Sequence, residues 1–233
     1  MTLNNQSVTV KVLTVAYFIA AMVEIMSELF DSTPLIIIFK PLLPLLLMVL
    51  YWFTSMIKNP FFFIAMSFLV VTNLLFIPDD DRMLFFGIII FMIHRIAVLF
   101  IIFQLIKLKD YIPMSIATVP FLLVFFYLLA TSTEIPEDSY TILAIQNVLI
   151  SILGGVALSN YIMNDKRQNT WLLISGLLFV SLQFIVFLEK YYLTDLSPAI
   201  FRPIAMALNV FAFYSFYEFV LTSENSDDNA SAF

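Results

Sequence analysis

Long runs of apolar residues, separated by short polar segments, make up most of the chain. Each run is close to the roughly 20 residues that an α-helix needs to cross the hydrocarbon core of a bilayer. No run carries a polar stripe along its full length, as a helix on the surface of a soluble protein would. The pattern therefore predicts spanning helices over the segments Val8 to Phe30, Leu35 to Met56, Pro60 to Ile77, Met83 to Ile106, Tyr111 to Thr131, Tyr140 to Met163, Thr170 to Leu188 and Pro198 to Thr222.

The segments between these runs are short, so consecutive helices are expected to be antiparallel neighbours. The predicted fold class is all-α, a polytopic membrane protein with a single transmembrane helical bundle over residues 1–222. The last segment, SENSDDNASAF at residues 223–233, is polar and is predicted to form a disordered tail. No internal repeat is visible.

Composition supports a membrane protein and excludes several other classes. Hydrophobic residues make up 62% of the 233 residues and charged residues 12%, whereas a soluble domain has about half and about a quarter. The absence of cysteine excludes disulfides and thiolate metal sites, and no cofactor or metal is predicted. The net charge of −6 argues against a nucleic-acid partner. The oligomeric state is not predicted.

Basic residues in the connecting segments predict the orientation, because positive loops stay on the cytoplasmic side. Both termini are therefore predicted to be cytoplasmic, and a bacterial inner membrane is the expected location. The basic residues on the predicted inner side are Lys11, Lys58, Lys107, Lys109, Lys166 and Arg167, against Arg82 and Lys190 on the other.

One lysine, Lys40, lies inside a predicted span and is followed directly by Pro41. An unpaired ammonium at the bilayer centre costs roughly 3 kcal/mol, so such residues usually face a bundle interior or an aqueous cavity. Two explanations stay open. The stem of Lys40 reaches back to the interface, or Lys40 belongs to an interior polar site where Pro41 loosens the helix.

Polar residues from seven predicted helices share a depth, between the membrane centre and the outer face. Each has a structural explanation, as an ion pair in the first hairpin or as an interhelical hydrogen bond. Their shared depth favours a functional site. These residues are Glu24, Glu28, Lys40, Asn73, Gln146, Asn147, Gln183 and Arg202, with His94 and Arg95 near mid-depth.

Several short motifs resemble the YhhN family, small eight-helix membrane proteins that include the lysoplasmalogenases. The most distinctive are the Lys-Pro pair and the unit formed by the third and fourth predicted helices. The resemblance covers nearly the whole chain. The motifs are Phe39 to Leu42, Met66 to Leu69, Thr72-Asn73, Phe86-Gly87, Phe91 to His94 and Gly176 to Phe179.

The resemblance implies hydrolysis of the vinyl ether bond of a lysoplasmalogen, which yields a fatty aldehyde and a glycerophospho head group. That reaction needs an acid, a carboxylate near the oxocarbenium ion and a water. The family's two intramembrane aspartates fall on Asn73 and near Gln183 in this chain, and a usual tyrosine falls near Ala205. Amides keep the shape of aspartate but do not exchange a proton at neutral pH.

Two hypotheses follow. The first is an active lysoplasmalogenase-like hydrolase that acts on lysoplasmalogens or a related lysolipid. The second is a catalytically silent family member that binds, senses or transports a lysolipid or another amphiphile in an outward-half pocket. In the first, Glu24 or Glu28 is the acid, and inward-pointing glutamates beside Asn73 are required. The other assigned roles are a phosphate contact for Lys40 or Arg202, water orientation for Asn73 and Gln183, proton transfer for His94 and substrate binding for Arg95 and Asn147.

Overall fold

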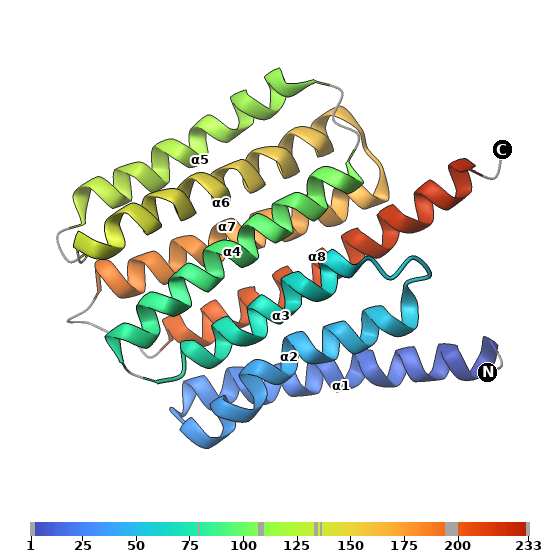
Figure 1. The fold of residues 1–233 in the computed structure, drawn as a ribbon, viewed down its shortest axis with the longest axis horizontal. Coiled ribbons are helices and arrows are strands. Elements are labelled where there is room, and N and C mark those ends of the chain that lie inside the picture. The colour runs from blue at the N-terminus through green and yellow to red at the C-terminus, as the bar shows by residue number, and fades with distance from the viewer. Residues whose placement is uncertain are drawn as a thin grey trace.

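The structure is a computed structural model that describes residues 3–78, 80–106, 110–132, 135, 137–193 and 200–231. Within these ranges the secondary structure is entirely helical, as predicted (Figure 1). The helices are α1 (Leu3–Leu29), α2 (Thr33–Thr54), α3 (Pro60–Leu75), α4 (Asp81–Leu105), α5 (Tyr111–Thr131), α6 (Glu137–Met163), α7 (Arg167–Tyr191) and α8 (Phe201–Ser231).

Seven of the eight helices are long and apolar enough to cross a membrane. The exception is α3, which has 16 residues and therefore a length of about 24 Å. The prediction of a helical membrane protein is confirmed at this level.

The α4 helix begins before the predicted apolar run because a polar residue caps it. The α4 helix begins at Asp81 rather than Met83, since the carboxylate of Asp80 accepts hydrogen bonds from the backbone N–H groups of Arg82 (2.9 Å) and Met83 (3.0 Å). Such caps supply acceptors for N–H groups that have no partner within the helix. Helix ends in polar surroundings are therefore not marked by hydrophobicity alone.

Consecutive helices pack as antiparallel neighbours, with α1 beside α2, α3 beside α4, α5 beside α6 and α7 beside α8 (Figure 1). The α8 helix is the central element, because it contacts α1, α2, α4 and α7. Its Phe216 is fully buried and stacks on Phe62 of α3 with ring centroids 6.1 Å apart. Both termini lie at the same end of the bundle, as an even number of antiparallel helices requires.

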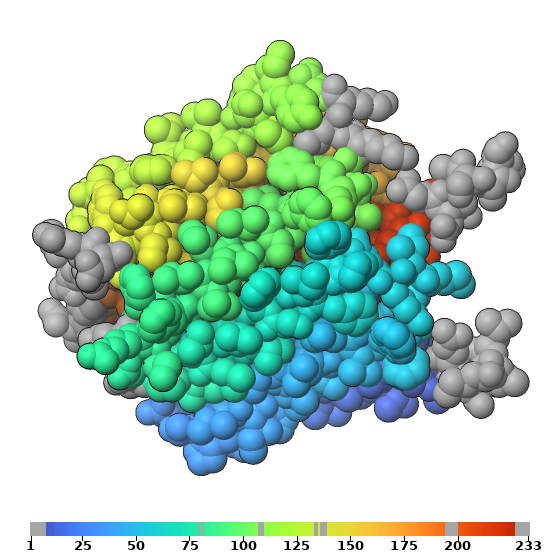
Figure 2. All heavy atoms as spheres, viewed as in Figure 1, coloured from blue at the N-terminus to red at the C-terminus, as the bar shows by residue number. Residues whose placement is uncertain are grey.

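Small residues allow the closest helix contacts. A Cβ atom at Gly155 of α6 would lie 2.8 Å from the backbone N and Cα of Thr118 on α5. A Cβ at Gly176 of α7 would lie 2.5 Å from the Cβ of Ala157 on α6. Helices in membranes associate through such small-residue contacts, because lipid supplies little hydrophobic driving force between them. Side chains fill the spaces between the ribbons on the face shown in Figure 2.

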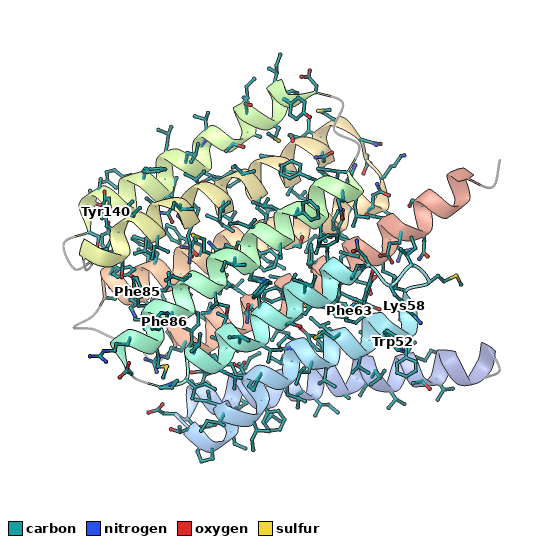
Figure 3. All side chains as sticks on the ribbon, in the orientation of Figure 1. Trp52, Lys58, Phe63, Phe85, Phe86 and Tyr140 are labelled. Carbon is teal, nitrogen blue, oxygen red and sulfur yellow. The ribbon has the colours of Figure 1, made fainter. Side chains whose placement is uncertain are left out.

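The exposed surface is apolar along the helices and aromatic at their ends. Figure 3 shows Trp52 and Phe63 beside Lys58 at one end, and Phe86 and Tyr140 at the other. The ammonium of Lys58 lies 4.2 Å from the ring centroid of Trp52. Tryptophan and tyrosine are typical of the two membrane interfaces. Exposed apolar residues of α1 include Val8, Val12, Val15, Ile19, Met22 and Met26.

The predicted disordered tail differs from the structure, in which α8 continues to Ser231. Glu224 is 3% exposed and holds this segment against the end of α2. Its carboxylate accepts hydrogen bonds from the hydroxyls of Tyr51 and Ser55, the latter over 2.7 Å. The α8 helix therefore continues past residue 222, where the sequence predicts the bundle to end, because a polar composition does not reveal that one of its acids is buried and bonded.

Candidate functional site

The two glutamates of α1 point into the bundle. Glu24 is 1% exposed and Glu28 is 8% exposed. They share a buried face with Tyr17 and Ser27, because these residues recur at helical spacing, while Met22 and Met26 face outward. The hydrolase hypothesis required this orientation, since lipid-facing glutamates would have ended it.

Lys40 of α2 forms an ion pair with Glu28 of α1. The Nζ–Oε1 distance is 2.8 Å, and the two side chains are 11% and 5% exposed. Lys40 is therefore part of a largely buried ion pair between α1 and α2. Removing one partner of a buried pair typically costs about 3–5 kcal/mol, because the other charge is left without compensation.

Asn73 of α3 binds the backbone of α2 at the same residue. Its Nδ2 donates a hydrogen bond to the carbonyl oxygen of Lys40 over 2.8 Å. In a regular helix that carbonyl would accept from the N–H of residue 44, but Pro44 has no N–H. Asn73 thus replaces the hydrogen bond that Pro44 removes. An ionised aspartate has no donor for this bond, so an asparagine suits this position.

Glu24 has no such partner. Neither of its carboxyl oxygens has a hydrogen-bond partner among the described residues, although both are buried. The hydroxyl of nearby Tyr17 is used elsewhere, since it donates to the carbonyl of Val210 over 2.9 Å. The hydroxyl of Ser27 donates to the backbone carbonyl of Glu24 and not to its carboxyl group. A buried polar group of this kind is costly, and in membranes it usually marks function.

Two hollows lie near these residues. One is a cavity of about 10 Å³ between α1, α2, α3 and α8, with room for about one water. Its polar lining is Asn73, Asn209 and Tyr17. Sequence reasoning missed Asn209, although a lone asparagine in the apolar run of α8 was a signal for it.

The other hollow is an open cleft of about 260 Å³ at the turn of the α1–α2 hairpin. Its lining is almost entirely apolar, and Ser27 lies at its buried side, between the two glutamates of α1. The residues around it are Met22, Val23, Met26, Ser27, Phe30, Ser32 and Leu35.

A second polar group lies between α4, α6 and α7. Arg95 of α4 is 5% exposed and donates from Nη2 to Oε1 of Gln183 over 2.6 Å. Its Nη1 donates to the carbonyl of Gln146 over 3.4 Å, and its guanidinium lies 4.5 Å from the ring centroid of Phe91. The Nε2 of Gln146 in turn donates to the carbonyl of Ile88. Gln183 therefore serves Arg95 and does not lie in the group formed by Glu28, Lys40 and Asn73.

His94 links α3 and α4. Its Nδ1 lies 2.8 Å from the carbonyl oxygen of Ala65, and because a carbonyl only accepts, this nitrogen carries the proton. The ring stacks on Phe91 and packs at a tilt against Phe213, with centroid distances of 5.7 and 5.3 Å. This arrangement gives His94 a packing role between helices.

Two candidate residues lie apart from both groups. The side chain of Arg202 is 63% exposed and pairs with Glu189 over 3.2 Å. Asn147 is fully buried, and its Nδ2 donates to the carbonyl of Phe125 on α5 over 3.3 Å. Depth along the membrane normal was thus an incomplete guide, because it does not say which side of a helix faces which neighbour.

Comparison with known proteins gives no further assignment. No protein-family model, no curated protein and no solved structure matches the chain. Among the described residues, no cluster of histidine, aspartate or glutamate is placed to hold a metal ion.

The role of Asn73 is tested by a double-mutant cycle with Pro44. We expect Asn73→Leu to lower the free energy of unfolding by about 1–3 kcal/mol, since the Lys40 carbonyl loses its donor. The measurement is the thermal unfolding temperature in detergent, which should fall. In the Pro44→Ala background the loss should shrink, because the restored N–H of residue 44 binds that carbonyl.

The matched control is Asn147→Leu, which also removes an amide donor to a carbonyl but lies far from Pro44 in the fold. Its effect should be the same in both backgrounds. An equal loss for Asn73→Leu with and without Pro44 would show that Asn73 does not replace the missing bond.

Proposed function

We propose that this protein is a membrane-embedded lysolipid hydrolase of the lysoplasmalogenase type, with Glu24 as its general acid. The observation that carries the proposal is the buried carboxyl of Glu24, which has no partner among the described residues and lies one helical turn from the Glu28–Lys40 pair. Two carboxyl groups in different environments can take different roles in one reaction. The resemblance to the YhhN family at Lys40-Pro41 supports the same chemistry.

The reaction is a hydration followed by cleavage. The acid transfers its proton to the β-carbon of the vinyl ether, which leaves an oxocarbenium ion at the carbon bonded to oxygen. Water adds to that carbon and gives up a proton to a carboxylate. The resulting hemiacetal then loses its hydroxyl proton and breaks its bond to the head-group oxygen, which takes up a proton, giving an aldehyde and an alcohol. Glu24 is the donor in this scheme, and Glu28, held by Lys40, is the carboxylate that faces the cation.

The open cleft is the proposed place for the substrate chain. It is apolar and lies at the turn between α1 and α2, and its lining includes Ser27, whose hydroxyl donates to the backbone carbonyl of Glu24. Lys40 is already occupied by Glu28, so it is not free to bind a phosphate. Arg202 also pairs with a glutamate, Glu189, but through its Nε, and its side chain is 63% exposed, so it is the better candidate for that contact.

A second function is favoured by a different observation. Both amides at the family's aspartate positions make hydrogen bonds that hold the bundle together, Asn73 to the Lys40 carbonyl and Gln183 to Arg95. The interior beside Asn73 leaves room for only about one water. These features suit a silent family member that binds, senses or carries a lysolipid without hydrolysing it.

The proposed topology has eight spanning helices with both termini in the cytoplasm, in a bacterial inner membrane. The described basic residues Lys11, Lys58, Lys166 and Arg167 support it, whereas Lys107 and Lys109 lie outside the described residues. A reporter enzyme that folds only in the cytoplasm should be active when it is fused after Phe233. Activity of a reporter that requires the outer side would reverse the orientation.

Activity is tested with purified protein, lysoplasmalogen and an ester lysolipid of the same head group. We expect aldehyde from the vinyl ether and no fatty acid from the ester. Glu24→Gln should lower the rate of aldehyde release about 100- to 10,000-fold, the usual contribution of a general acid. The control is Glu218→Gln, which makes the same change about four helical turns along α8 from Arg202.

The outcomes separate the two functions. Wild-type protein that binds lysoplasmalogen and releases no aldehyde supports the silent member. Aldehyde release that survives Glu24→Gln would assign the acid to another residue.

A further inference from the structure

The guanidinium of Arg95 is a buried cation whose charge is not balanced within the described part of the chain. Its hydrogen bonds there go to two neutral oxygens, the side-chain oxygen of Gln183 and the backbone oxygen of Gln146. Lys40 and Arg202, in contrast, each have a glutamate partner. None of the proposed reaction steps uses Arg95.

A guanidinium inside a membrane bundle needs more than hydrogen bonds. It keeps its charge in proteins, and neutral acceptors satisfy its N–H groups without supplying a counter-charge. Intramembrane arginines are expensive and are almost always paired or part of a ligand pathway. The ring of Phe91, 4.5 Å from the guanidinium, adds a weak attraction that does not replace an anion.

The neighbours of Arg95 suit an anion that binds reversibly. The Oε1 atom of Gln183 lies 2.6 Å from Nη2 of Arg95. An oxygen of a carboxylate or phosphate would accept a hydrogen bond from the guanidinium at the same position. A glutamine amide carries an acceptor and two donors. It can therefore offer its oxygen to Arg95 in the free protein and turn its NH₂ group toward a bound anion.

The site is also supported from several helices. Arg95 lies midway along α4, Gln146 on α6 and Gln183 on α7, and Gln146 is fixed by its own bond to the carbonyl of Ile88 over 2.9 Å. The three side chains are all buried, at 5%, 3% and 6% exposure. Rigid helices with a second layer of hydrogen bonds are the arrangement that a binding site needs.

We propose that Arg95, with Gln183 and Gln146, forms a binding site for an oxyanion, namely the phosphate of a lipid head group or free phosphate. The site lies between α4, α6 and α7, apart from the Glu24 group between α1, α2 and α3. It does not depend on the hydrolase proposal, since a protein that releases no aldehyde can still bind an anion here.

The test is the thermal unfolding temperature of the full chain in neutral detergent, at fixed pH and ionic strength. Three probes are compared: sodium phosphate against sodium chloride, a lysophospholipid, and a neutral monoacylglycerol with the same chain. A ligand that binds only the folded state raises the unfolding temperature in a saturable way. We expect such a rise with phosphate or with the lysophospholipid, and none with chloride or the neutral lipid.

The decisive variant is Gln183→Glu, which puts a carboxylate beside Nη2 and so supplies the counter-charge from within. It should unfold at a higher temperature than the wild type without any ligand and should lose the ligand-induced rise. Arg167→Gln is the control and should keep that rise, because Arg167 is exposed at the start of α7 and has no part in either proposed site.

The probes also identify the source of the anion. A rise with inorganic phosphate supports a free anion, and a rise with the lysophospholipid alone supports a head group. The proposal is overturned if neither probe raises the unfolding temperature, or if the rise persists unchanged in Gln183→Glu.

Discussion

The carbonyl oxygen of Lys40 is the group around which the first three helices are arranged. Pro44 removes its helical partner, and in a bilayer no water is available to replace it. Asn73 of α3 supplies the missing donor, while the ammonium of the same lysine binds Glu28 of α1. One residue of α2 therefore ties three helices together, through its backbone on one side and its side chain on the other.

Once these bonds are made, two buried ionisable groups in the described residues remain without an ion pair. Glu24 is a buried acid with no hydrogen bond to its carboxyl group, and Arg95 is a buried cation bound only by neutral oxygens. They belong to different sets of helices, so they do not neutralise each other. Groups that break the usual rules of burial are expected at functional sites, where their cost is offset elsewhere in the fold. The stability of the α1–α3 group is one such offset.

The sequence predicted the helices well because a membrane span requires a long apolar run, and such runs are visible without any structure. An ion pair in the first hairpin was one explanation that the sequence left open, since Lys40 and the two glutamates lie on consecutive antiparallel helices. It did not predict that Asn73 would bind a backbone carbonyl, although the absence of an N–H at Pro44 marks that carbonyl. Nor did it separate Gln183 from Asn73, because depth in the membrane does not specify the direction around a helix. The burial of Glu224 was hidden by the polar residues around it.

The central claim is that Glu24 is kept in the bundle for function and not for stability. The most direct measurement is the thermal unfolding temperature of Glu24→Leu beside that of Glu28→Leu. Glu24→Leu should unfold at the same or a higher temperature than the wild type, because it replaces an unpartnered buried acid by an apolar side chain. Glu28→Leu should unfold at a lower temperature, because it leaves the Lys40 ammonium buried without a partner. If Glu24→Leu is destabilised as strongly as Glu28→Leu, Glu24 has a structural partner and the claim is wrong.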